Sequence, residues 1–252
     1  MNAERPTFSI FIPAYNAEKT LPGVLARIPR ETMRSVKSVW IVNDGSTDGT
    51  WSAVEKAAAE NDRIKGINLE KNRGYGGALK AALSRLAQES PDVAVCLHAD
   101  GQYAPEEIPA MLDELHSRKL DLLQGSRIAG GTALAGGMPL YKYVAGKMLT
   151  ALENLVFRTK MTDRHSGFLV YGRRTLETMN FAALSDSFDF DLEVIASAVS
   201  LKLSVAERPI PTSYGGEVSH LNPLTYGLRV LRVLWRYLNG RYSRLHAPER
   251  RR

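Results

Sequence analysis

The sequence predicts an α/β fold with a mostly parallel, Rossmann-like sheet that helices cover on both faces. Apolar runs of strand length alternate with segments of helical periodicity, five times in succession. A polar loop follows each run. Such alternation is typical of parallel strands joined by helical crossovers. The 252 residues are enough for one large α/β domain.

The first half of the chain carries this alternation. Strands are expected over residues 8–12, 36–42, 64–69, 93–97 and 120–124. Helices are expected over residues 19–28, 47–61, 78–88 and 106–118, with Ser46 or Thr47 capping the second of them. Right-handed crossovers would bring all five strand ends to one edge of the sheet. That edge would collect Tyr15, Asn16, Asp44, Gly74, Asp100, Gln102 and Arg127.

The second half is less regular. A glycine-rich loop at residues 130–137 is either a lid over a substrate or an ordinary surface connection. Helices are expected over residues 141–157, 190–201 and 224–238, and strands over 168–171 and 205–210. The last of these helices is amphipathic, carries Trp235 and leads into a basic tail. It either packs on its own domain or attaches to an anionic membrane surface.

The net charge of +6 indicates an anionic partner such as a nucleotide, a phospholipid or a nucleic acid. The glycine cluster follows the third strand rather than the first, which argues against a dinucleotide dehydrogenase. The sequence has no P-loop and no recognised motif for binding RNA or DNA, so no nucleic-acid partner is expected. The single cysteine, Cys96, lies in an apolar run and is expected to be a buried, unreactive thiol.

A polar cluster, His98, Asp100 and Gln102, directly follows the fourth strand. Ligands of open α/β sheets bind beyond the carboxyl ends of the strands. A carboxylate at that place is suited to hold a divalent cation that also binds phosphate oxygens of a substrate. The alternative is that Asp100 only caps the next helix or forms a turn with Gly101.

Several motifs stand in the order found in family 2 glycosyltransferases. They lie at residues 12–16 (IPAYN), 42–50 (VNDGSTDGT), 72–76 (NRGYG), 99–102 (ADGQ), 125–127 (GSR) and 163–168 (DRHSGF). The chain resembles this family over about its first 215 residues. Within the family it is most similar to the dolichyl- or polyprenyl-phosphate mannose synthase branch.

The resemblance implies a GT-A fold, a nucleotide-diphosphate sugar donor and Mg²⁺ or Mn²⁺. It implies an inverting transfer of a hexose to a polyprenyl phosphate by one domain. Residues 1–128 would bind the nucleotide sugar, residues 129–223 the acceptor, and residues 224–252 would form the basic amphipathic helix and tail. The residues implied in binding the nucleotide sugar are Pro13, Ala14, Tyr15, Asn16, Asp44, Gly74 and His98.

The chain departs from the family at two places. His98 stands where the family has the first Asp of its Asp-x-Asp motif, so we expect Asp100 and Gln102 to be the metal ligands and His98 to lie behind them. On the acceptor side, Lys142 and His220 replace family residues. With Arg127 they would form a cationic pocket for the acceptor phosphate.

The residues expected to carry the reaction are Asp100, Arg127 and Asp163, with Asp163 as the base if the acceptor is a hydroxyl. Two alternatives remain open. One is transfer to a hydroxyl of a cell-surface polysaccharide or glycolipid, and the other is a non-catalytic module that binds nucleotide sugars. The sequence has no apolar stretch of membrane-spanning length, so a cytoplasmic protein is expected, either free or held at the inner face of the membrane by lipid or a membrane protein. The sequence predicts no oligomeric state.

Overall fold

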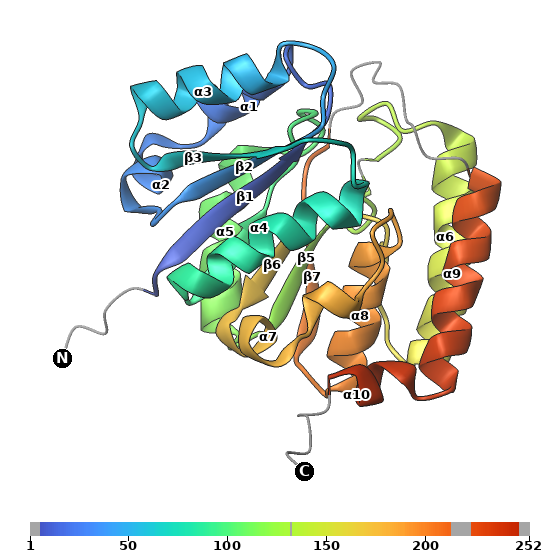
Figure 1. Cartoon of the computed structure of the whole chain (residues 1–252). Helices are drawn as coiled ribbons and strands as arrows, with labels where there is room; N and C mark the ends of the chain where they lie inside the picture. Colours follow the sequence, from blue (N-terminus) through green and yellow to red (C-terminus); the bar gives the residue numbers. More distant parts are fainter. Residues whose placement is uncertain (1–5, 132, 213–222, 247–252) are drawn as a thin grey trace.

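The structure is a computed structural model that describes residues 6–131, 133–212 and 223–246. Within these residues its centre is a seven-stranded sheet of order β3-β2-β1-β4-β6-β5-β7 (Figure 1). All neighbouring pairs are parallel except those of β6, which runs antiparallel to β4 and β5. The predicted mostly parallel sheet is thus confirmed. Its strands are β1 (Phe8–Ala14), β2 (Val39–Asp44), β3 (Ile64–Leu69), β4 (Val93–Cys96), β5 (Leu122–Ser126), β6 (Leu169–Gly172) and β7 (Val205–Pro209).

The central strands are apolar throughout because both faces of the sheet are buried. In β1, Phe11 belongs to one core cluster, whereas Ile10 and Ile12 belong to the other, as the two-residue period of a strand requires. The face of Ile10 is covered by α1 (Leu21–Arg27), α3 (Thr50–Glu60) and α5 (Ile108–Ser117). The face of Phe11 is covered by α4 (Tyr75–Glu89) and α8 (Phe190–Ser200).

The reversed strand β6 matters for the site. Because it runs against its neighbours, its amino end lies at the edge where β4 and β5 have their carboxyl ends. Residues 163–167, which lead into β6, therefore reach the edge to which the sequence assigns the substrate.

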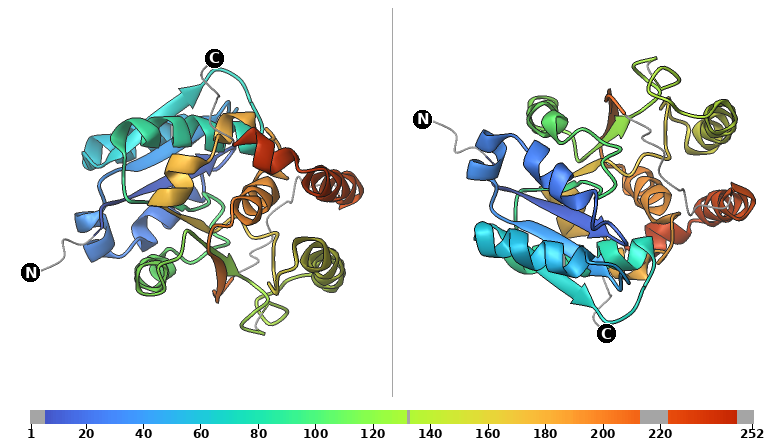
Figure 2. Two further views of the ribbon diagram at one scale, coloured as in Figure 1. Left: turned by 90° about the horizontal axis from the view of Figure 1, so that it is seen from below. Right: turned by 90° about the horizontal axis from the view of Figure 1, so that it is seen from above.

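Two further helices extend the core on the face of Phe11. α6 (Leu140–Phe157) and α9 (Pro223–Leu238) lie side by side along one flank of the molecule in every view (Figures 1 and 2). The rings of Phe157 and Tyr237 join them edge to face, with centroids 4.7 Å apart. None of the described helices is both long and apolar enough to cross a bilayer.

The structure differs from expectation in some short elements. Helices α2 (Arg30–Ser35), α7 (Arg173–Thr178) and α10 (Arg241–Leu245) were not expected. The expectation that Ser46 or Thr47 caps α3 is wrong: the helix begins at Thr50, whose N–H donates to Asp48 Oδ1 at 3.0 Å. A 3-10 turn (Pro105–Glu107) precedes α5. Cys96 is buried, as expected, and burial raises the pKa of its thiol well above the usual range.

Candidate active site

The loops that follow β1 and β2 are bonded to each other. Asn16, which has a positive φ of 49°, accepts the N–H of Thr47 on its side-chain oxygen at 2.9 Å. In return its own N–H donates to Ser46 Oγ at 2.9 Å. Tyr15 stands beside this link with 43% of its surface exposed, whereas Pro13 and Ala14 belong to β1 itself. The hydrogen bonds between Asn16, Ser46 and Thr47 therefore tie the two loops together into one rim at the ends of β1 and β2.

Asp44 ends β2 and is almost fully buried. Burial raises the pKa of its carboxyl, while N–H groups of Arg73 and Gly74 act in the opposite direction. The N–H of Arg73 lies 2.7 Å from Asp44 Oδ1. Gly74 has a φ of 80°, and a Cβ there would meet the carbonyl oxygen of Asp186 at 2.5 Å, so this position requires glycine. Asp44 thus anchors the loop before α4 rather than capping α3.

The predicted metal cluster follows β4. Asp100 Oδ1 accepts the N–H of Gln102 at 2.9 Å, which forms a tight turn, and both side chains remain partly exposed. The described residues contain no group of three or more His, Cys, Asp or Glu side chains that could hold a metal. A carboxylate beside an amide is a donor set for a hard cation that takes further oxygen ligands from phosphates. The residues present therefore fit Mg²⁺ or Mn²⁺ shared with a diphosphate.

His98 is held by a chain of hydrogen bonds that the sequence did not reveal. Its Nε2 lies 2.9 Å from the hydroxyl of Tyr75, and that hydroxyl donates to Asp191 Oδ2 at 2.7 Å. A phenol has one proton, so when it bonds to Asp191 the proton toward His98 comes from Nε2. Burial lowers the pKa of His98, which favours the neutral ring.

Asp191 lies in the first turn of α8, 7% exposed. Burial raises the pKa of its carboxyl to about 7, against a lowering effect of the Tyr75 hydrogen bond. Within the described residues its second oxygen has no hydrogen-bond partner. A carboxylate between Phe190 and Leu192 in an apolar helix was the available signal in the sequence, because buried carboxylates are rare without a role.

On the other side of His98, Arg127 and Asp163 form a bidentate ion pair. The distances are 2.7 Å from Arg127 Nε to Asp163 Oδ2 and 3.0 Å from Nη2 to Oδ1. The backbone N–H groups of Arg127 and His165 also donate to this carboxylate. Burial would raise the pKa of Asp163, but the charge of Arg127 and these hydrogen bonds hold it at about 2.

The two sides meet at the rings of His98 and Tyr103, whose centroids are 5.0 Å apart. The charges of Asp100 and Arg127 both act on the pKa values of these rings, so all four groups lie close together. Gly167 donates its N–H to the Tyr103 hydroxyl at 2.9 Å, and a Cβ on Gly167 would meet the His98 ring at 2.4 Å. The ends of β2 and β4 are separated only by β1, or about 10 Å.

Lys142 and His220 are the other two residues predicted to bind the acceptor phosphate. Lys142 lies in the first turn of α6 and is partly exposed, while His220 lies outside the described residues. His165 is buried, with Nδ1 2.8 Å from the Tyr226 hydroxyl and Nε2 3.6 Å from Glu153 Oε2. Burial lowers the pKa of His165 to about 4. These contacts hold the His165 ring between Tyr226 and Glu153, which indicates a structural role.

The comparison with known families agrees with this geometry. A family described as Glycosyl transferase family 2 matches residues 9–179, which is more than half of the chain and contains β2 to β6 and all of β1 except Phe8. The chain is a family 2 glycosyltransferase.

Relatives of this glycosyltransferase include enzymes of archaea and bacteria. It is 28% identical over 217 residues to UDP-N-acetylglucosamine–dolichyl-phosphate N-acetylglucosaminyltransferase of Methanococcus voltae, covering 81% of this chain and 85% of that protein. It is 30% identical over 204 residues to polyprenol monophosphomannose synthase of Mycolicibacterium smegmatis, covering 80% of this chain and 75% of that protein.

Solved structures share the fold of the glycosyltransferase. Glucosyl-3-phosphoglycerate synthase from Mycobacterium tuberculosis, crystallised with UDP, matches with a TM-score of 0.70 at 18% identity, over 93% of this chain and 80% of that one. A crystal of the same enzyme with Mn²⁺, UDP and glucosyl-3-phosphoglycerate matches with a TM-score of 0.62 at 18% identity, over 97% and 82%. The predicted GT-A type fold is thereby confirmed.

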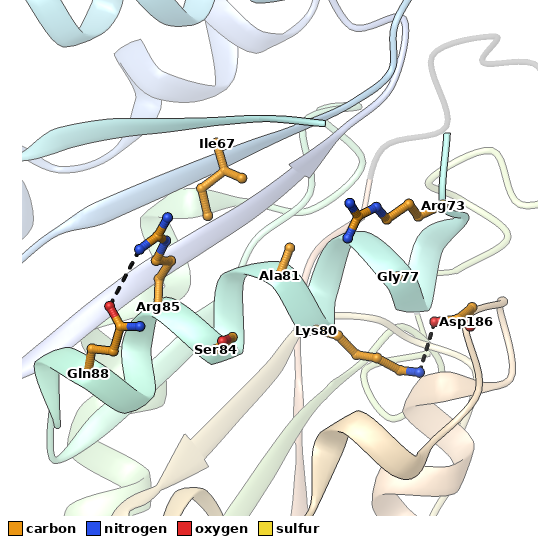
Figure 3. A pocket seen from close by; sticks show the side chains of 9 residues that line it. All are labelled: Ile67, Arg73, Gly77, Lys80, Ala81, Ser84, Arg85, Gln88 and Asp186. Carbon is orange, nitrogen blue, oxygen red and sulfur yellow. Dashed lines mark hydrogen bonds and ion pairs between the residues drawn. The ribbon is translucent and has the colours of Figure 1, made fainter. Parts of the chain in front are cut away.

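A hollow of the glycosyltransferase lies along α4, away from the predicted site. This groove has a volume of about 540 Å³, and Lys80 Nζ pairs with Asp186 Oδ1 at 2.8 Å across one end of it (Figure 3). Arg73 lies near the same end, before the start of α4, and its N–H reaches Asp44, whereas Arg85 and Gln88 lie at the other end (Figure 3). The groove runs along α4 and includes neither the His98 cluster nor Arg127.

Proposed function

We propose that this glycosyltransferase moves a hexose from a nucleotide-diphosphate sugar to the phosphate of a polyprenyl phosphate, with inversion at the anomeric carbon. The names of two relatives support a polyprenyl-type acceptor, since they are a dolichyl-phosphate transferase and a polyprenol monophosphomannose synthase. Neighbours of the same fold that hold UDP and Mn²⁺ support the nucleotide donor and the metal. Such an acceptor would place the enzyme in the cytoplasm, at the inner face of a membrane.

The donor would bind to the half formed by residues 1–128. The linked loops of Asn16 and Thr47 form the rim, where the exposed ring of Tyr15 offers a stacking surface for a base. The Asp44 carboxylate, held by the N–H of Arg73, is placed to accept hydrogen bonds from the base or the ribose. His98 and Gly74 would complete the donor site.

Asp100 and Gln102 would hold Mg²⁺ or Mn²⁺ against the diphosphate. When bound, the metal neutralises the charge that grows on the leaving diphosphate, and such stabilisation is commonly worth several kcal/mol. His98 Nε2 is engaged by Tyr75, which supports its predicted place behind the metal ligands. Through the chain from Asp191, His98 would fix the orientation of the Asp100 turn.

The observation that carries the choice of acceptor is the state of Asp163. Four N–H groups of the described residues donate to its two oxygens, and its pKa is held at about 2. Such a carboxylate is a poor base, because a general base works best with a pKa near the operating pH. A lipid phosphate is already ionised at neutral pH and needs no base. Asp163 would instead hold the Arg127 guanidinium toward the acceptor phosphate, with Lys142 beside it and residues 129–223 forming the acceptor half.

One observation favours a second candidate, transfer to a sugar hydroxyl. The pKa of Asp191 is raised by burial to about 7, which is the range of a general base. Its oxygen Oδ1 lacks a hydrogen-bond partner among the described residues. Asp191 is separated from the strand ends by Tyr75 and His98, however, so it would have to act through them.

The proposal is tested by measuring release of nucleoside diphosphate with a panel of nucleotide sugars and Mg²⁺ or Mn²⁺. Each sugar is offered with a polyprenyl phosphate and, as the matched control, with the same polyprenol without its phosphate. The expected result is release and formation of a lipid-linked sugar only with the phosphate. Transfer to oligosaccharide acceptors but not to the lipid phosphate would favour the second candidate and overturn the first.

The role of Asp100 is tested by Asp100→Ala. Loss of the metal ligand removes transition-state stabilisation, and we expect turnover to fall about a thousandfold, which corresponds to about 4 kcal/mol. Asp113→Ala, on the exposed side of α5, is the control and should keep full activity. Turnover near that of the unmodified enzyme in Asp100→Ala would contradict the metal site.

A further inference from the structure

The helix α6 carries a stripe of large apolar side chains on its solvent side. Its members follow one another at intervals of three or four residues, which places them on one face of a helix. They are between 38% and 76% exposed, and Glu153 and Phe157 occupy the opposite, buried face. The stripe consists of Tyr141, Val144, Met148, Leu152 and Leu155.

The helix α9 carries a second stripe of the same kind. Val230, Val233 and Leu234 form its buried face and already belong to the core. The second apolar face comprises Leu228, Leu231, Trp235 and Leu238, which are between 50% and 69% exposed. An ordinary surface helix has one apolar face, so α9 has one face more than its own fold requires.

The two stripes lie on neighbouring helices. α6 and α9 are neighbours in both views of Figure 2 and are joined by the ring contact of Phe157 with Tyr237. On α9, Arg229 and Arg236 pair with Asp189 and Glu193 of α8, so that side of the helix faces the core, and the apolar stripe lies on another. Contiguous apolar patches of this kind mark a site of interaction. We refer to the two stripes together as the α6–α9 surface.

The charges around this surface are of one sign. Over residues 140–157 and 223–245 the only acidic residue is Glu153, which is fully buried. Burial raises the pKa of Glu153 to about 8. Exposed cations are contributed by Lys147, Arg232 and Arg241. A face that combines aliphatic side chains, Trp and cations, with no exposed acid, has the composition of a surface that binds anionic lipid.

We propose that the α6–α9 surface docks on an anionic lipid bilayer, with both helices lying in the plane of the headgroups. A symmetric contact with a second copy would bring the cations of two such surfaces together, which disfavours a dimer. The inference rests on the proposed function in one respect. The loop that precedes α6 follows Arg127, so docking would set the acceptor site at the level of the lipid phosphates.

The test uses vesicles that contain neither donor nor acceptor, so it does not depend on the reaction. We expect the full chain to float with vesicles of phosphatidylcholine and phosphatidylglycerol, weakly with phosphatidylcholine alone, and less as salt rises. The variant Met148→Ser/Trp235→Ser, with one change on each helix, should bind the anionic vesicles at least tenfold more weakly. Both side chains are about two-thirds exposed, at 70% and 67%, so the variant should fold normally.

Charge is tested separately with a matched pair. Arg232→Gln/Arg241→Gln should weaken binding to anionic vesicles, whereas Lys71→Gln/Arg85→Gln, which removes the same charge elsewhere on the surface, should not. Equal binding by all variants, or no binding of the unmodified chain at low salt, would overturn the proposal. A dimer in solution that Met148→Ser/Trp235→Ser makes monomeric would also overturn it, because a second copy would then cover the surface.

Failure of the docking proposal and failure of the proposed function give different results. With a short, water-soluble polyprenyl phosphate, Leu231→Ser/Trp235→Ser, which changes two exposed residues outside both proposed substrate-binding halves, should keep the activity of the unmodified enzyme while losing vesicle binding. Vesicle binding without any transfer to the lipid phosphate would leave docking in place and reject the acceptor.

Discussion

The two flanks of His98 carry buried carboxylates with opposite properties. On one flank Asp163 is surrounded by N–H donors and has a pKa of about 2. On the other flank Asp191 accepts a hydrogen bond from the Tyr75 hydroxyl and from no other donor of the described residues, and it has a pKa of about 7. Both carboxylates are buried, so burial does not explain the difference. The number and charge of the donors decide which carboxylate stays ionised.

We expect this difference to divide the work of the proposed site. The Asp163 flank keeps a fixed pair of charges at every physiological pH, which suits the binding of an anionic acceptor. The Asp191 flank can take up or release a proton near neutral pH, and it holds a neutral His98 behind the Asp100 turn. The following substitutions test this division.

The largest effect is expected from Asp163→Asn. The change removes the carboxylate that pairs with the Arg127 guanidinium, which is 15% exposed, and breaking a buried pair in this way costs about 4 kcal/mol. The lowered pKa of Asp163 stabilises the fold above its unfolded pKa of 3.8, and this stability is lost as pH falls toward 2. Denaturant unfolding should therefore show that the variant is less stable than the unmodified chain at neutral pH. Its free energy of unfolding should also fall less when the pH is lowered.

The matched control is Glu31→Gln, since Glu31 pairs with Arg34 and the two side chains are 85% and 73% exposed. Exposed pairs contribute about 1 kcal/mol or less, so this variant should stay close to the unmodified chain. Equal losses of stability in the two variants would show that the Arg127–Asp163 pair contributes no more to stability than an exposed ion pair.

Asp191→Asn should change how stability depends on pH. A carboxyl with a raised pKa in the folded state contributes stability below its unfolded pKa of 3.8, and that contribution is lost as pH rises through about 7. Between about pH 5 and pH 8 the free energy of unfolding of the unmodified chain should fall by about 2 to 3 kcal/mol, and that of the variant should not show this fall. If the free energies of unfolding of the two proteins changed equally with pH across this range, Asp191 would be ionised throughout.

Gly167→Ala tests the boundary between the flanks. The added Cβ would lie 2.4 Å from the His98 ring and 2.7 Å from the Tyr75 hydroxyl, so the ring must move. We expect a cost of about 2 kcal/mol from overpacking, together with weaker metal-dependent donor binding in thermal-shift titrations. Gly23→Ala, where nothing lies within 4 Å of the new Cβ, is the control. If Gly167→Ala bound the nucleotide-sugar donor as well as the unmodified chain does, the position of the His98 ring would not matter for the proposed metal site.

The smallest effect is expected from Tyr75→Phe. It removes the hydrogen bond to Asp191, which costs about 1 kcal/mol, and with it the effect that lowers the pKa of this carboxyl. The pH at which stability falls should therefore move upward relative to the unmodified chain, whereas the acid response of the Asp163 flank stays the same. A downward shift of this pH would show that a donor other than Tyr75 stabilises the ionised Asp191 carboxylate.

The order of the long elements could be predicted from the sequence because strand and helix periods are visible over long windows. The short helices α2, α7 and α10 could not, since five or six residues do not show a period. The reversal of β6 was not predicted either, because an apolar run has no direction. The cap of α3 was assigned to the wrong residue since several adjacent polar residues compete for it.

The candidate site was predicted in part. Residues at the strand ends, such as Asp44, Asp100 and Arg127, follow from topology, and the structure places them at one edge. Tyr75 and Asp191 are 116 positions apart, so their contact could not be inferred from spacing. The sequence also could not show that the Asp163 carboxylate accepts four N–H groups and stays ionised, because these donors come together only in the folded chain.

The solitary thiol at Cys96 has a practical consequence. Because it is enclosed and holds its proton firmly, alkylating reagents should pass it by in the native enzyme. A spin label or fluorophore could then be attached at Lys147→Cys or Arg232→Cys without first removing the natural cysteine. Accessibility of such a probe to oxygen and to a water-soluble relaxation agent would give its depth at a vesicle surface directly.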